Sequence, residues 1–105
     1  KKLKTGMDAF YRKQWKKAAD AWAKSLENST NGTLNGKLAH NLAIVSEIQG
    51  DLRQAKAYSD KSVEYFMSAF LLSYDQFMMV VGYNAELDIR LKEAETVNQQ
   101  LGENP

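Results

Sequence analysis

The sequence predicts an all-α protein of antiparallel helix hairpins, and three observations lead to that class. Apolar side chains recur at three- and four-residue steps along most of the chain, which places them on one face of a helix. A tight turn at Gly50-Asp51 joins two of these stretches directly. Residues 28–36 are rich in Asn, Ser, Thr and Gly, which favour loops. A length of 105 residues limits the chain to one domain.

The first hairpin is predicted over residues 3–27. Trp15 and Trp22 lie two helical turns apart and share a face. We expect Trp15 to pack on the first helix of this hairpin and Trp22 on the helix that follows the loop. Residues 1–25 carry eight basic and two acidic side chains, whereas residues 26–105 carry six and eleven. This basic segment suits an anionic partner or ordinary solvated helix faces, and without a recognition motif we expect no nucleic acid.

The second hairpin is predicted over residues 36–70, after a loop at 28–36. Gly50 suits the left-handed conformation that ends a helix, and Asp51 suits the cap of the next one. Because the turn is short, the two helices must pack side by side, and Ala43 and Ala55 are expected to be buried between them. The apolar face of the first of these helices comprises Leu38, Leu42, Val45 and Ile48.

The last third of the chain is predicted to form a C-terminal helix, about 74–100, that covers the end of the hairpins. The preceding apolar run, 66–83, is interrupted by polar residues near its middle, so we expect no membrane span. Its apolar side chains form two stripes, and a single neighbouring helix cannot cover both of them. They are either ordinary core or, in part, an interface with another domain or a second copy. The candidate interface residues are Phe66, Phe70, Phe77 and Met78.

Candidate chemistry is sparse. The chain has no cysteine, which excludes disulfides and thiol chemistry, and His40 is its only histidine. A zinc site around a single histidine would be unusual, and neither a glycine-rich phosphate loop nor a serine nucleophile elbow is present. We therefore expect no catalytic residue, no metal and no cofactor, and we do not expect an enzyme. His40 itself is either a groove residue or a partly exposed surface histidine.

The second hairpin resembles a tetratricopeptide repeat. The likeness lies in Asn41-Leu42-Ala43, in Gly50-Asp51-Leu52 and in Ala55, and a shift of 37 residues brings several positions of the first hairpin into register with it. The family's closing proline is missing, since the only proline is Pro105. The resemblance implies a right-handed superhelix of stacked hairpins, with the C-terminal helix as its cap.

The same resemblance implies a protein interaction scaffold, because the concave face of such repeats binds a peptide or a partner protein. Carried over by position, that face comprises Met7, Phe10, Tyr11, Lys37, His40, Asn41, Ile44, Glu47 and Ile48. Gln76 and Val80 stand where members that grip a C-terminal carboxylate carry Lys and Arg, so an apolar or mixed groove is expected. The alternative is a structural module that packs on an upstream domain or on a second copy, with no separate ligand.

A weaker likeness covers residues 7–19 together with the motifs of the second hairpin. It looks like the C-terminal repeat module of uncharacterised bacterial envelope lipoproteins, which follows a larger domain. This likeness implies a location in the bacterial cell envelope or periplasm. The chain begins with Lys1 rather than Met, so we expect it to be a piece of a longer protein.

Overall fold

A computed structural model describes residues 2–69 and 74–103 of the chain. Over these residues the protein is all-helical, as predicted, with five helices and no strand. The helices are α1 (Lys2–Tyr11), α2 (Trp15–Glu27), α3 (Gly32–Ile48), α4 (Leu52–Ala69) and α5 (Tyr74–Glu103). None of the helices, as far as the structure describes them, is both long and apolar enough to cross a membrane.

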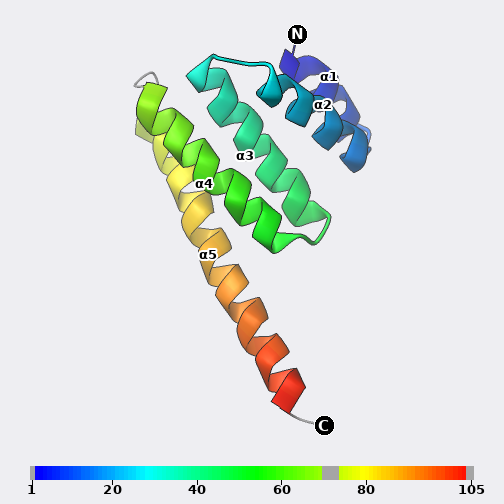
Figure 1. Ribbon diagram of the computed structural model, residues 1–105, viewed down its shortest axis with the longest axis vertical. Helices are drawn as coiled ribbons and strands as arrows, with labels where there is room; N and C mark the ends of the chain where they lie inside the picture. The colour runs from blue at the N-terminus through cyan, green and yellow to red at the C-terminus, as the bar shows by residue number, and fades with distance from the viewer. Residues whose placement is uncertain (1, 70–73, 104–105) are drawn as a thin grey trace.

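Each helix packs against the next one in the chain, and neighbouring helices run in opposite directions (Figure 1). α5 is the exception in length, because its second half projects well beyond the end of α4 (Figure 1). The projection makes the molecule elongated, with extents of 51 × 30 × 21 Å. The part of α5 up to Glu95 contributes to the packed body, since Arg90 pairs with Glu47 of α3 and Glu95 with Arg53 of α4.

The turn between α3 and α4 follows the prediction. Gly50 has a φ of +85°, in the left-handed region that glycine adopts without strain. The Asp51 carboxylate then accepts a hydrogen bond from the backbone N–H of Gln54 at 3.0 Å, which caps α4. The turn between α1 and α2 has no glycine; Lys13 takes a φ of +59° there, and the Gln14 N–H donates to the Ala9 carbonyl at 2.9 Å.

The loop predicted over 28–36 is wrong in its second half, because α3 already begins at Gly32. The Asn31 side chain accepts from the backbone N–H of Leu34 at 3.0 Å, so the Asn-rich composition caps a helix rather than extending a loop. The Asn35 amide donates back to the Ser29 carbonyl at 3.2 Å and fixes the approach of the chain. Only residues 28–31 connect α2 to α3.

The core confirms the predicted burial of the small and aromatic residues. Ala43 and Ala55 are 0 % exposed. Trp22 is 1 % exposed and belongs to a cluster with residues of α3, as predicted; its indole also lies so close to Gly6 that a Cβ there would be 2.0 Å from it. Trp15 packs edge-to-face on Phe10 of α1, with ring centroids 5.2 Å apart. The buried cluster contains Ala9, Ala18, Trp22, Leu38, Leu42 and Val45.

α3 and α4 pack tightly at Gly36. A Cβ on Gly36 would lie 2.5 Å from the ring of Phe66, and the Ser62 hydroxyl donates to the Gly36 carbonyl at 2.8 Å. Both Ser62 and Phe66 are buried. Because Gly36 has no side chain, the Phe66 ring can lie directly against the α3 backbone. The Ser62 hydroxyl provides a hydrogen bond to the Gly36 carbonyl, which this packing shields from solvent.

We predict that Gly36→Ala lowers the free energy of unfolding by about 1–3 kcal/mol, because the added methyl group overpacks the Phe66 ring. Urea unfolding followed by circular dichroism measures the change. The matched control is Gly82→Ala in α5, where a Cβ meets nothing within 4 Å. There the lower chain entropy of alanine should stabilise the protein by about 0.5–1 kcal/mol. Equal effects at the two glycines would contradict the close packing at Gly36.

Candidate functional site

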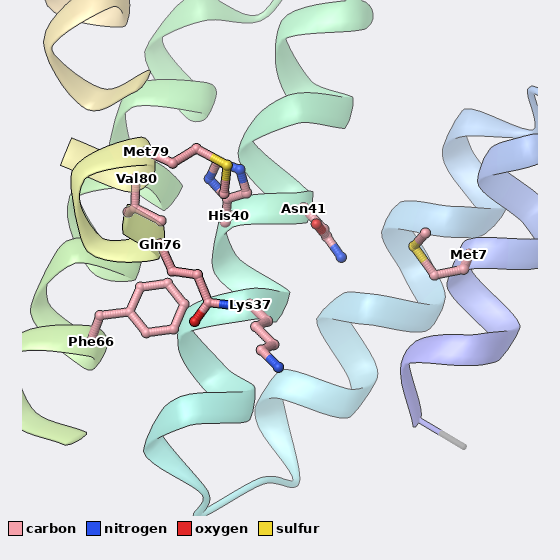
Figure 2. Close-up of a pocket in the computed structure, with 8 residues that line it drawn as sticks. All are labelled: Met7, Lys37, His40, Asn41, Phe66, Gln76, Met79 and Val80. Atoms are coloured by element: carbon pink, nitrogen blue, oxygen red, sulfur yellow. The ribbon is translucent and has the colours of Figure 1, made fainter. Parts of the chain in front are cut away.

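The candidate site is a cavity of about 320 Å³, which we call the His40 pocket (Figure 2). Four helices build it: α1, α3, α4 and α5. Its lining residues are Met7, Lys37, His40, Asn41, Phe66, Gln76, Met79 and Val80. Residues from four separate stretches of the sequence therefore meet at one concavity.

The pocket has an apolar floor and a polar rim. Phe66 and Val80 are buried, whereas Lys37, Gln76 and Met79 are exposed. Within the described part of the chain, no carboxylate lines it, and Lys37 is the one lining residue with a permanent charge. A small, largely apolar concavity with a few polar groups at its edge is the usual form of a site that accepts a side chain or a small molecule.

His40 is the most unusual group in the pocket. Its Nδ1 atom is buried and has no hydrogen-bond partner among the described residues. The imidazole meets the Tyr83 ring edge-to-face, with centroids 5.2 Å apart. Burial lowers the pKa of His40, because the charged form loses its solvation. The neutral imidazole is therefore the form that the pocket favours.

Tyr83 links the pocket to a polar chain on the same side of the molecule. Its hydroxyl donates to the Glu47 carboxylate at 3.0 Å, and burial raises the pKa of Tyr83, so the phenol keeps its proton at neutral pH. Glu47 also forms an ion pair with Arg90 of α5. These contacts hold the first half of α5 against α3 and fix the wall behind His40.

The structure brings together four of the nine residues predicted to bind a partner: Met7, Lys37, His40 and Asn41 all line the pocket. The other five lie outside its lining. Phe10 packs on Trp15 and Trp22, Tyr11 is exposed, and Ile44 is half-buried. Glu47 is engaged by α5, and Ile48 is exposed near the end of α3.

The predicted interface residues separate in the same way. Phe66 is wrong as an outward-facing residue, because it is 5 % exposed and packs on Gly36. Phe77 is half-buried and Met78 is 45 % exposed. Phe70 lies outside the described residues. Two further methionines, Met67 and Met79, are exposed by 59 % and 58 %.

The predicted binding residues include none from α5, although Gln76 and Val80 stand at the positions compared with those that grip a carboxylate. Gln76, Met79 and Val80 follow Lys37, His40 and Asn41 by 39 residues each. The same interval separates Gly82 from Ala43, so the signal was present in the sequence. It was obscured because the turn motif Gly50-Asp51 has no counterpart in α5, which continues as one helix.

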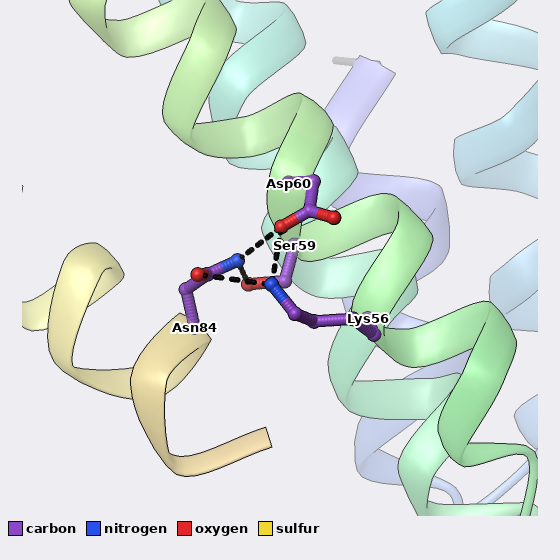
Figure 3. A network of polar contacts seen from close by, with 4 residues as sticks. All are labelled: Lys56, Ser59, Asp60 and Asn84. Atoms are coloured by element: carbon purple, nitrogen blue, oxygen red, sulfur yellow. Dashed lines mark hydrogen bonds and ion pairs between the residues drawn. The ribbon is translucent and has the colours of Figure 1, made fainter. Parts of the chain in front are cut away.

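Besides the Tyr83 contacts, a polar network ties α5 to α4 (Figure 3). The Asn84 amide nitrogen donates to the Ser59 hydroxyl at 3.1 Å and to the Asp60 carboxylate at 2.8 Å. The Lys56 ammonium donates to Asp60 at 2.5 Å and to the Asn84 carbonyl oxygen at 3.2 Å. Because α5 supplies three lining residues, this network also positions the pocket.

Asp60 is the titrating member of the network. Burial acts to raise its pKa, but the hydrogen bonds from Lys56 and Asn84 and the positive charge of Lys56 outweigh burial, so the pKa is lowered. A carboxylate with a lowered pKa in the folded state stabilises the fold above its unfolded pKa. That contribution is lost as the pH falls through the lowered value.

We predict that Asp60→Asn lowers the free energy of unfolding at neutral pH and that the difference from the wild type shrinks progressively as the pH falls below about 4. Urea unfolding at a series of pH values measures both. The control is Asp20→Asn, since Asp20 faces Lys16 only in an exposed pair at 3.9 Å and such pairs contribute little. A difference at Asp60 that stayed constant from neutral pH down to about pH 2 would show that the charge of Asp60 is not what holds α5.

Among the described residues, no group of three or more His, Cys, Asp or Glu side chains could hold a metal ion.

Comparisons with known proteins give a family but no function. No curated protein and no solved structure matches the chain significantly. One family model, a domain of unknown function termed DUF6340, matches residues 4–89, which include the five helices up to the middle of α5 and every lining residue of the His40 pocket. The chain therefore belongs to the DUF6340 family.

Proposed function

We propose that this chain is a tetratricopeptide-like binding module that holds a peptide or an exposed segment of a partner protein in the His40 pocket. The observation that carries the proposal is the internal repetition of the pocket. Lys37, His40 and Asn41 of α3 and their counterparts 39 residues later in α5 line one cavity. In a repeat protein, the binding surface is expected to be lined by equivalent positions of successive repeats.

The small residues of the repeat support the same proposal. Gly6 and Ala43 occupy matching positions, 37 residues apart, and both are buried. At these positions a larger side chain would collide with the helix that follows, as the distance from Gly6 to Trp22 illustrates. The first helix of each pair is thereby packed tightly on one side, which leaves its other side to line a groove.

The chemistry of the pocket favours binding over catalysis. Its floor is apolar, and its polar groups are one ammonium, two amides and one imidazole. Among the described residues, no carboxylate or hydroxyl group lines it that could act as a base or nucleophile beside His40. Apolar anchors that enter such a cavity commonly supply most of the affinity of a protein–peptide contact.

A second candidate is self-association or packing on another domain. The exposed methionines 67, 78 and 79 favour it, because unbranched thioether side chains adapt to apolar partners. Met79 belongs both to this surface and to the rim of the pocket. The two candidate functions therefore predict contacts at neighbouring but separable positions.

Site-specific photo-crosslinking in the intact protein, in the cells that produce it, tests the proposal. A photoreactive residue at Met79 should give an adduct with a different protein, whereas one at Lys61, exposed on α4 outside the pocket, should give none. We predict that Asn41→Trp, which fills the pocket, reduces the Met79 adduct by about tenfold, the loss expected for about 1.4 kcal/mol of binding energy.

The outcomes separate the two candidates. An adduct of the chain with a second copy, insensitive to Asn41→Trp, would favour self-association. Equal adducts from Met79 and Lys61 would contradict both. Circular dichroism and urea unfolding of each variant confirm that the change does not simply unfold the protein.

A further inference from the structure

His40 sits where a bound group would have to touch it. It lines the pocket beside Asn41 and Met79, and Figure 2 shows its ring between the α3 backbone and the Met79 side chain. It is the only histidine of the chain, and no other side chain titrates, when unperturbed, between pH 5 and 8. The protonation of one residue therefore controls the charge inside the cavity over this range.

The hydrogen bonding of His40 disfavours its charged form. A charged imidazole carries a proton on both nitrogens and needs an acceptor for each. Nδ1 is enclosed and has no acceptor among the described residues, so its proton would be a buried donor without a partner. The neutral ring with its proton on the other nitrogen avoids that cost.

The groups around His40 act in the same direction. On its own helix, Lys37 lies one turn earlier and lines the same pocket, so a second positive charge would be repelled. From α5 the ring meets Tyr83, which is uncharged. Glu47 lies on α3 like His40 itself, and its carboxylate is already engaged by Tyr83 and Arg90. α1 and α4 contribute Met7 and Phe66, neither of which is charged.

We infer that the His40 pocket takes an uncharged apolar side chain of its partner against the neutral form of His40, so that binding releases a proton from His40 and weakens as the pH falls. The inference rests on the proposed function. An apolar group in the cavity removes the solvent that remains around the imidazole, and desolvation penalises only the charged form. By linkage, if binding of the apolar group favours the neutral form of His40, then the neutral form of His40 favours binding to the same extent.

A neutral apolar dye, N-phenyl-naphthylamine, provides the probe, since its fluorescence rises when it enters an apolar cavity and it carries no charge across this range. We expect saturable binding at about pH 8 and a dissociation constant at least about twofold higher at about pH 5, because burial lowers the pKa of His40 and the ring takes up a proton only in the acidic part of this range. His40→Gln, which cannot take up a proton, should bind with the same affinity at both pH values.

Lys61→Gln is the matched control. It removes a charge on the exposed face of α4 outside the pocket lining, so it should retain the pH dependence of the wild type. The proton resonances of the single histidine ring provide a second measurement on the unaltered chain, where saturating dye should lower the pKa of His40 further. This measurement stands even where His40→Gln fails to fold.

The failures of the two ideas are distinguishable. Dye binding that is abolished by Asn41→Trp but is equal at both pH values overturns the proton linkage and leaves the pocket as a binding site. A pH dependence that persists in His40→Gln also overturns the linkage. The absence of saturable binding at either pH overturns both the linkage and the apolar pocket on which it rests.

Discussion

The contact on which the rest of the structure depends is the packing of the Phe66 ring on the backbone of Gly36. It sets the distance between α3 and α4, the two helices that carry most of the buried small residues. Because Phe66 also forms part of the pocket floor, the same contact decides how deep the cavity is. Ser62 makes the approach sustainable by donating to the Gly36 carbonyl. Fold and site thus share one constraint rather than being separate layers of the molecule.

Local chemistry made much of the fold predictable. The turn at Gly50-Asp51 needs one residue at positive φ and one capping acceptor. Glycine and aspartate are the residue types that favour these two roles. The burial of Ala43 and Ala55 follows from the same turn, because two helices joined so closely must touch. The position of Trp22 was predictable for a different reason, since an indole at that spacing has a large area to bury.

The start of α3 and the composition of the pocket were less predictable, and the reasons are physical. Asn, Gly and Thr in residues 28–36 serve equally well in a loop or in the first turn of a capped helix, so composition alone cannot place the boundary. Gly36 looks like a loop residue until Phe66 is known to lie over it. The α5 wall of the pocket depends on where a helix 39 residues later comes to rest. That position is decided by side-chain contacts such as those of Asn84 and Tyr83, which no local pattern encodes.

The projecting half of α5 gives one continuous helix two local stabilities. Its contacts with the body run from the pocket through Leu87, which is fully buried, to the ion pair of Glu95 with Arg53 at 3.0 Å. From Thr96 to Gln99 every described side chain is exposed. Backbone amides up to about Glu95 can exchange with solvent only when α5 detaches from α3 and α4, whereas those after it exchange whenever the helix end frays. The end of α5 can therefore unwind and re-form many times while the wall of the pocket stays in place.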